Sequence, residues 1–499
     1  MSDTPRRGWI TASVMLATIM QVLDLTIANV ALPHMQGSLS ATQTQVAWVL
    51  TSYVVAAAIM TPATGFLSAR LGRKQLLLIS ISGFTVASAL CGAATSLPEI
   101  IAFRILQGLF GATLVPLSQA LLLDTYPKEQ HGSAMALWGV GVMVGPILGP
   151  SLGGILTEYY NWRWVFYINV PLGLLALSGI AAFVKATPKQ DRPFDITGFA
   201  YLTVAIGALQ LMLDRGESEG WFTSPEVLTE AVLFIVGIYL FVVQTLTARK
   251  PFINPVIFLD RNFSVGLIFI FVLGIVLLAT MALLPPFLQN LMGYSVLDTG
   301  YVLAPRGLGS MASMMMVGRL LGKVDARYMI FTGLLLIAYS LWDMTRFTTD
   351  VGTWPIVYTG VVQGVGLGLV FVPLNTLSFA TLAPRFRDDG ASLYSLMRSI
   401  GSSIGTSIVV TLFGRNTQVN HAVLSEQVTS FNAPHLPPAW QITDPTGVAA
   451  LNAEVTRQAA TIAYLDDFHF MMYVTLAAIP LLLLIRAPRR QPAAEAAEA

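Results

Sequence analysis

Asp24 and Arg104 are the two side chains whose types and positions most clearly suggest chemistry. Each lies inside a long apolar run, Asp24 nine residues before Pro33 and Arg104 six residues after Pro98. A carboxylate at the centre of a bilayer costs roughly 2.5–3.5 kcal/mol on insertion scales, so such a residue is by default a functional candidate. We interpret Asp24 as a proton carrier. The alternative is a permanent salt bridge that holds the first helix to a neighbour.

Arg104 is the expected partner of Asp24. If the run with Asp24 crosses outward and the run with Arg104 crosses inward, both side chains lie about 9–14 Å below the outer surface, at 1.5 Å per residue. Because arginine keeps its proton, it would stabilise the carboxylate when close and release it when the helices shift. Gln107, one turn further on, could orient either group. The second half has Gly360 at the position of Arg104, so this chemistry is expected in the N-terminal half alone.

Several other residues inside apolar runs are candidates for a substrate cavity. Arg306 and Arg398 could meet anionic groups of a substrate or pair with backbone carbonyls. Methionines cluster between residues 311 and 316. Their flexible side chains suit a pocket of broad specificity, although gap-filling is their more frequent role. The predicted cavity residues are Gln21, Gln107, Trp138, Tyr167, Arg306, Met315, Asn375 and Arg398.

Composition places these residues in a membrane protein. The 499 residues are 55% hydrophobic and only 11% charged, with a mean hydropathy of +0.67, whereas soluble domains carry about a quarter charged residues. A bilayer core needs roughly 20 apolar residues per helix, and that length predicts fourteen spans. They lie near 10–32, 46–68, 75–95, 99–122, 133–156, 164–184, 197–213, 229–247, 264–288, 299–321, 328–346, 355–379, 390–413 and 467–485.

The distribution of positive charge predicts the orientation of the chain. With a cytoplasmic N-terminus, 20 of the 28 Lys and Arg residues fall in inward segments and five in outward segments, while three lie inside spans. Positive residues collect on the cytoplasmic side, so we expect both termini in the cytoplasm. The first apolar run is too long for a signal peptide and is expected to be a retained span.

The sequence contains an internal repeat. Residues 107–117 of the fourth span are echoed by residues 363–373 of the twelfth, at an offset of 256. Residues 65–74 recur at 318–327, at an offset of 253. We therefore predict a six-helix bundle at 1–190, an inserted pair of spans at 191–262 and a second bundle at 263–489. Two such halves around a midplane site are typical of alternating-access transporters.

Short motifs give this organisation a family resemblance. They comprise residues 23–33 (LDLTIANVALP), 104–108 (RILQG), 164–171 (WVFYINVP) and 213–216 (LDRG), together with Gly65, Gly72, Arg73 and Lys74, and the fifth-span set Gly141, Gly145, Pro146, Gly149, Pro150 and Gly153. The chain resembles the major facilitator superfamily, in its fourteen-span drug:proton antiporter branch. The resemblance implies an all-α integral membrane protein with the major facilitator fold, in which Asp24 carries protons and the fifth-span motif marks an exporter.

Two of these motifs suggest moving parts. Glycines of the fifth span allow close helix approach and its prolines add bends, which suggests a hinge and a seal against the eighth span or the opposite bundle. Gly65, Arg70, Gly72, Arg73 and Lys74 form the predicted cytoplasmic gate. Ala69 and His131 stand where the family usually has an acid and an arginine, while Asp124 and Asp325 are expected nearby.

These observations predict a proton-driven exporter of small amphipathic molecules in the inner membrane. The alternative is a proton-coupled transporter of one metabolite, fatty acid or lipid. We expect no enzyme activity and no cofactor besides the proton gradient, since the five histidines are scattered and no phosphate-binding loop is present. A net charge of +1 argues against nucleic acid. Expected partners are substrates, protons, lipid and, at a predicted outward loop 415–464, a membrane-fusion adaptor with its outer-membrane channel. Residues 490–499 are a predicted disordered tail.

Overall fold

The computed structural model describes residues 4–190, 193–429, 437, 440–441 and 444–485. Helices dominate this part of the chain, and no strand occurs within it. Twelve of its helical segments are long and apolar enough to cross a membrane. Two further predicted spans form helices of their own, α13 and α14, which pack against α15. The predicted tail 490–499 lies outside the described residues.

The first bundle consists of six helical rods. The rods are α1 (Thr4–Ser38); α2 (Gln43–Met60) with its continuation α3 (Thr64–Leu71); α4 (Arg73–Ala93); α5 (Leu97–Gly111) followed by α6 (Leu114–Thr125); α7 (His131–Tyr159); and α8 (Trp164–Tyr167) followed by α9 (Asn169–Phe183). Gly72, at a φ of 85°, makes the turn between α3 and α4, a conformation that glycine adopts without strain.

The inserted pair and the second bundle follow. The inserted helices are α10 (Ile196–Arg215) and α11 (Pro225–Thr247). The second bundle contains α12 (Arg261–Pro286), α13 (Val296–Leu320), α14 (Ala326–Met344), α15 (Thr353–Ala380), α16 (Arg387–Glu426) and α17 (Pro445–Ala477) with a last turn at Ile479–Leu484. The bundles share their internal pairings, since α1 packs on α7 as α12 packs on α16, and α2 on α5 as α13 on α15. This arrangement agrees with the internal repeat.

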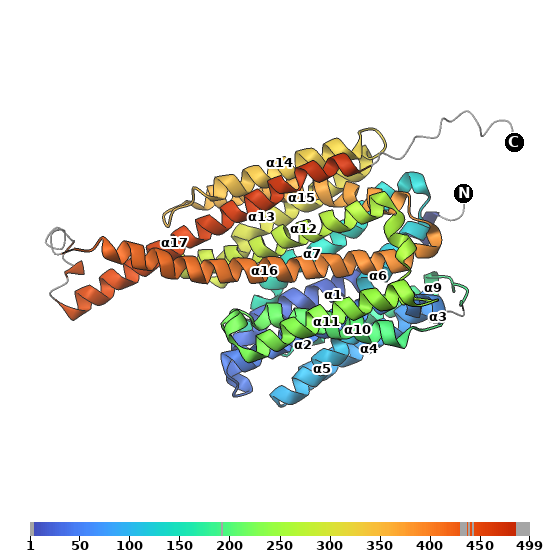
Figure 1. Ribbon diagram of the computed structural model, residues 1–499, viewed down its shortest axis with the longest axis horizontal. Helices are drawn as coiled ribbons and strands as arrows, with labels where there is room; N and C mark the ends of the chain where they lie inside the picture. Colours follow the sequence, from blue (N-terminus) through green and yellow to red (C-terminus); the bar gives the residue numbers. More distant parts are fainter. Residues whose placement is uncertain (1–3, 191–192, 430–436, 438–439, 442–443, 486–499) are drawn as a thin grey trace.

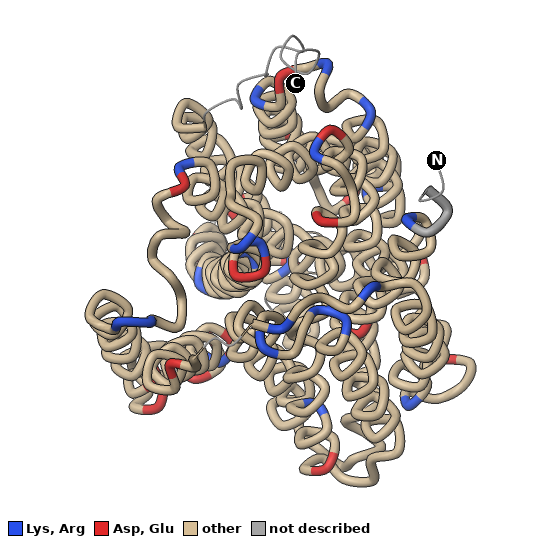
Figure 2. The backbone as a smooth tube through the Cα atoms, turned by 90° about the vertical axis from the view of Figure 1, so that its right-hand side faces the viewer, with Lys and Arg blue, Asp and Glu red and all other residues tan. Residues whose placement is uncertain are grey.

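Two ends of the molecule can be told apart. At the terminal end α1 begins and the last helical turn closes beside α12, where Arg261 Nε donates to the carbonyl of Leu484 at 2.7 Å. At the opposite, hairpin end, α16 and α17 project beyond the other helices (Figure 1). Seen from the terminal end, several helix connections carry Lys and Arg (Figure 2).

The predicted loop 415–464 is wrong as a loop over most of its length. Helix α16 continues to Glu426, and α17 already begins at Pro445. A helix of 40 residues is about 60 Å long, twice the hydrocarbon thickness of a bilayer. Apolar runs do not indicate these extensions, because both are rich in polar residues.

The fifth-span glycines pack α7 onto α1. A Cβ atom on Gly145 would lie 2.6 Å from the backbone carbon of Val22, and Gly149 meets Thr26 as closely. The hydroxyl of Thr26 donates to the carbonyl of Gly145 at 2.9 Å. The predicted seal against the eighth span is therefore replaced by a close fit against the first. Helix α7 also contacts the opposite bundle, since Ile147 lies on Gly307 of α13.

This packing predicts that Gly145→Ala is destabilising. The new methyl group would clash with backbone atoms of α1, and overpacking of this kind costs roughly 1–3 kcal/mol. A lower melting temperature in detergent is the expected result. Gly154→Ala on the same helix is the control, because its methyl group would be 4.0 Å from the nearest neighbour, in Val296. Equal melting temperatures for the two variants would contradict the account.

Candidate functional site: a buried carboxylate and a latch between the bundles

Asp24 lies in a sealed polar cluster on α1. Its side chain has no solvent exposure. Arg104 Nη1 donates to Oδ2 at 2.6 Å, while Gln107 Nε2 and Asn169 Nδ2 both donate to Oδ1 at 2.8 Å. Three donors from α5 and α9 therefore surround the carboxylate, in short charge-assisted bonds that fix its position.

Arg104 keeps other partners besides Asp24. Its Nε donates to the carbonyl of Val49 at 2.9 Å, and its Nη1 also reaches Oε1 of Gln107 at 2.7 Å. The guanidinium carbon lies 4.2 Å from the ring centroid of Tyr53, within cation–π range. Loss of the bond to Asp24 would therefore leave the arginine held in place by α2 and α5.

Local helix geometry explains most of this cluster. Arg104 and Gln107 are three residues apart and therefore share one face of α5. Asn169 was missed by the sequence analysis as a site residue, although it lies in a quoted motif. It begins α9, and its Nδ2 also bonds to Ser88 of α4 at 3.0 Å. The amide side chain of Asn169 inside an apolar run was the feature of the sequence that could have identified it as a site residue.

Three of the predicted cavity residues contact neighbouring helices, two of them across the boundary of the bundles. Gln21 accepts a bond from the backbone of Val115 at 3.1 Å. The ring of Trp138 stacks on Phe371 across the boundary, with centroids 5.7 Å apart. Gln119 of α6 donates to Asn375 of α15 at 2.7 Å. The partners in this last bond are 256 residues apart, so equivalent positions of the two halves meet.

Arg306 and Arg398 are unpaired cations. Both are deeply enclosed by protein, yet each keeps part of its surface accessible. Among the described residues, neither side chain has a hydrogen bond or ion pair, with a carboxylate or with a backbone carbonyl. Of the two roles left open by the sequence, pairing with carbonyls is thus absent here.

Two predicted cavity residues lie elsewhere. Tyr167 packs against Gly92 and the ring of Trp164, whereas the neighbouring Phe166 lies near the guanidinium of Arg104. Met315 is 49% exposed, on the same face of α13 as the exposed residues Tyr301 and Leu308. Met314 is the buried member of the methionine cluster and meets Gly139 of α7. Seven-residue spacing places Met315 on the outer stripe of the helix.

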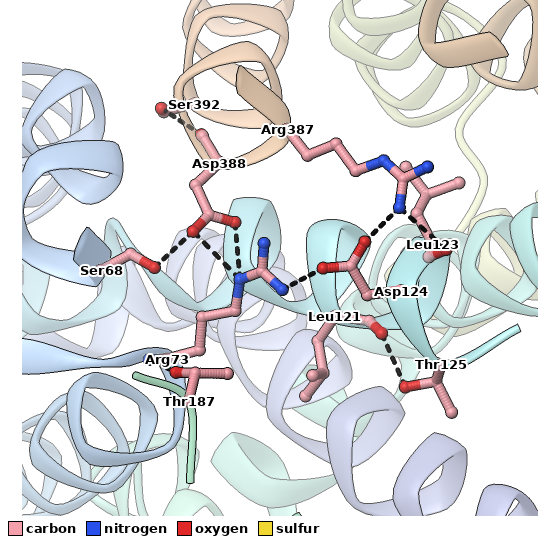
Figure 3. A network of polar contacts seen from close by, with 10 residues as sticks. All are labelled: Ser68, Arg73, Leu121, Leu123, Asp124, Thr125, Thr187, Arg387, Asp388 and Ser392. Atoms are coloured by element: carbon pink, nitrogen blue, oxygen red, sulfur yellow. Dashed lines mark hydrogen bonds and ion pairs between the residues drawn. The ribbon is translucent and has the colours of Figure 1, made fainter. Parts of the chain in front are cut away.

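A four-residue latch joins the bundles at the terminal end (Figure 3). Arg73 pairs with Asp388 at 2.8 Å and with Asp124, and Arg387 pairs with Asp124 as well. Ser68 adds a bond to Asp388. The signs of the charges therefore alternate from Asp388 through Arg73 and Asp124 to Arg387, and the two outer residues come from the second half. Arg73 and Asp124 were expected here from the sequence. Arg387 and Asp388 were not, because they lie more than 250 residues further along the chain.

The other predicted gate residues surround this latch. Gly65 lies against Asp389, close enough that any side chain at residue 65 would clash. Lys74 Nζ donates to the carbonyl of Ala181 at 2.7 Å, while Arg70 is exposed. Arg387 lies 256 residues after His131 and supplies the arginine that the first half lacks. Asp325, expected near the gate, instead caps the start of α14.

Comparisons with known proteins agree with this geometry. The family model of the Major Facilitator Superfamily matches residues 14–406. The chain belongs to the major facilitator superfamily. It is 35% identical to the fatty acid resistance protein FarB of Neisseria gonorrhoeae, over 98% of both chains. It is also 37% identical to the multidrug export protein EmrB of Escherichia coli K12, over 85% of this chain and 83% of that protein.

A solved structure gives the same fold. The human organic anion transporter MFSD10 (TETRAN) superposes with a TM-score of 0.61 at 14% identity, over 94% of this chain and 99% of that one. This transporter is therefore a multi-pass membrane protein with the predicted major facilitator fold. Its relatives are transporters, not enzymes, as the sequence analysis expected.

The latch predicts that Arg387→Gln opens the terminal end. Loss of one partner of a partly buried ion pair costs about 1–3 kcal/mol, and 1.4 kcal/mol changes a population about tenfold. Spin labels at Lys128→Cys and Lys323→Cys, on opposite bundles, should report longer distances in this variant. The only native cysteine, Cys91, is buried. The matched control is Arg70→Gln, and identical distance distributions in the two variants would rule out the latch.

Proposed function

We propose that this transporter exports small amphipathic molecules across the inner membrane in exchange for protons. The observation that supports this most strongly is the Asp24 carboxylate, which is sealed from solvent and held by Arg104, Gln107 and Asn169. The terminal end is closed by the latch in the same conformation. Positive residues collect on cytoplasmic segments, so the terminal end faces the cytoplasm and the latch is the cytoplasmic gate.

Proton exchange at Asp24 gives a mechanism for coupling. A proton that arrives from the outer side neutralises Asp24 and weakens its bond to Arg104. The guanidinium then stays with Val49, Gln107 and Tyr53, so it is not left without partners. Since half of a buried ion pair is costly when left alone, these partners lower the barrier to the exchange. One charge that crosses 100 mV supplies about 2.3 kcal/mol. This energy drives the export of the substrate.

The movement of Asp24 reaches the gate through α7. Helix α7 packs on α1 through its glycine face and on α13 of the opposite bundle through Ile147. Its first residue, His131, follows the short turn after Asp124 of the latch. A shift of α1 relative to α5 therefore moves the element that joins the two bundles, as alternating access requires.

Acidic amphipathic substrates are the second candidate. Arg306 and Arg398 are enclosed cations without a carboxylate partner among the described residues. The relative that is aligned over 98% of both chains is a fatty acid resistance protein, and another is a multidrug export protein. An unpaired arginine is well suited to a carboxylate, so a fatty acid is a natural alternative to a neutral or cationic drug.

A further proposal concerns the projecting hairpin of α16 and α17. It extends beyond the membrane-spanning helices (Figure 1) and carries exposed apolar residues at Val419, Val423 and Val448. Exposed apolar side chains on a rigid projection suit a protein partner. We infer that a periplasmic adaptor docks here and connects the transporter to an outer-membrane channel.

Gradient-driven transport in liposomes tests the coupling. With an imposed pH gradient, wild-type protein should move a lipophilic fluorescent dye and protons in opposite directions, while Asp24→Asn should move neither. Glu129→Gln, at an exposed acid, is the control and should transport normally. Asp24→Asn removes the counter-ion of Arg104, so the double variant Asp24→Asn with Arg104→Gln serves as a second test. Retained dye binding verifies the fold of the double variant. Proton-coupled dye movement in either Asp24 variant would refute the assignment.

Photo-crosslinking in the cells that express this transporter tests the hairpin. A crosslinking amino acid at Val419 or Val423 should yield a covalent product with an adaptor protein. The same group at Tyr328, which is 70% exposed at the terminal end, should not. If the hairpin positions yield no protein product while export continues, the hairpin is a solvated projection without an adaptor.

A further inference from the structure

The second half contains a neutral counterpart of the Asp24 cluster. At an offset of 256, Thr280 takes the place of Asp24, Gly360 that of Arg104, and Gln363 that of Gln107. Gln363 Nε2 donates to Thr280 Oγ1 at 3.4 Å, as Gln107 donates to Asp24. Thr280 Oγ1 also contacts the sulfur of Met471 on α17, at 3.6 Å. The pairing of helices is retained, whereas the charges are lost.

A buried carboxylate lies one helical turn from this counterpart cluster. Asp467 precedes Met471 by four residues on α17, and therefore shares its face. Its side chain has no solvent exposure. Neither Oδ1 nor Oδ2 has a hydrogen-bond partner in the part of the chain that the structure describes. Asp24, by contrast, accepts three bonds.

Aromatic rings dominate the surroundings of Asp467. The adjacent residue Phe468 packs against Phe347, and Tyr464, one turn away, packs against Phe287 and Phe413 at 5.3 and 4.3 Å between centroids. An ionised carboxylate that is buried without a partner is strongly disfavoured in such surroundings.

No cation on the neighbouring helices offsets a charge at Asp467. The groups that act on it are Asp466 and Tyr464 of its own helix. The helices packed against α17 carry charged side chains that, among the described contacts, make neither a hydrogen bond nor an ion pair with Asp467. They are Arg261 on α12; Arg327 and Asp343 on α14; and Arg387, Asp388, Asp389, Arg398, Arg415, His421 and Glu426 on α16.

The hairpin end offers a polar approach to this carboxyl group. Asp467 lies 17 residues before the end of the last helical turn at Leu484, or roughly 25–30 Å, near the outer boundary of the hydrocarbon. On α16, Asn416 contacts the neighbouring Asp466 at 3.4 Å. Thr417 Oγ1 and Asn420 Nδ2, further outward, are buried without partners in the described structure. These atoms could bind the water that delivers a proton.

We propose that Asp467 is a second proton-binding site, located in the C-terminal half and occupied by a proton in this conformation. The inference rests on the proposed proton-driven export. The proton binds to one carboxylate oxygen while the cytoplasmic latch is closed, and leaves it when the opposite conformation brings water or a cation to α17. The transporter then carries one acid in each half, on α1 and on α17.

Infrared spectroscopy and flux measurements on Asp467→Asn test this site. Wild-type protein at neutral pH should show the C=O absorption of a protonated carboxyl group, and Asp467→Asn should lose it. In liposomes the ratio of protons to exported dye should fall by about one in this variant. Asp466→Asn is the matched control, because its carboxylate already bonds to Asn416, and it should keep both the absorption and the ratio.

The outcomes separate this inference from the proposed function. An unchanged proton ratio in Asp467→Asn, with dye transport intact, would overturn the second site and leave Asp24 as the proton carrier. A wild-type protein that moves dye without protons would overturn both. If Asp467→Asn does not fold, Asp467→Glu provides the test: it should keep the ratio and shift the absorption, and an unshifted absorption would assign the band to another residue and overturn the inference.

Discussion

The fold depends on how a charged pair is kept inside a membrane. A carboxylate and a guanidinium without solvent exposure are tolerated only when they meet each other and their remaining polar atoms are satisfied. Asp24 and Arg104 meet each other, and most of their other polar atoms are bonded by Val49 of α2, Gln107 of α5 and Asn169 of α9, which Ser88 of α4 holds in turn. Nη2 of Arg104 is the exception in the described structure, with no hydrogen-bond partner. Four helices of the first bundle are therefore held in register around one buried carboxylate.

The two halves carry different polar groups at equivalent positions. The first half keeps the charged cluster, while its counterpart in the second half is the neutral contact of Thr280, Gln363 and Met471. At the latch the charged residue lies in the second half instead, because Arg387 stands where the first half has His131. Equivalent positions meet where Gln119 bonds to Asn375. Symmetry thus sets the backbone framework, and the departures from it carry the proposed chemistry.

Much of this arrangement could be predicted from the sequence. Helix rise and the proline markers placed Asp24 and Arg104 at one depth, and three-residue spacing placed Gln107 beside them. The length of about 20 apolar residues per spanning helix located the spans, because the length of an apolar run is a local property of the sequence. The fold prediction is confirmed by the family and by the all-helical structure.

The errors share a physical cause. Asn169, Arg387 and Asp388 act through contacts between helices that are distant in the chain, and spacing along one helix does not reveal such contacts. Met315 was selected by residue type, but its place on α13 gives it an outer face. The extensions of α16 and α17 are helices rich in polar residues, so a search for apolar length gives no signal there.

Proton release on substrate binding tests the central claim most directly. In weakly buffered detergent solution, addition of a saturating lipophilic dye to wild-type protein should release protons, because the substrate and the proton on Asp24 compete. The account predicts that this release falls in Asp24→Asn while dye affinity is retained and loses its dependence on pH. An equal release from the variant would contradict the claim that Asp24 is the coupling acid.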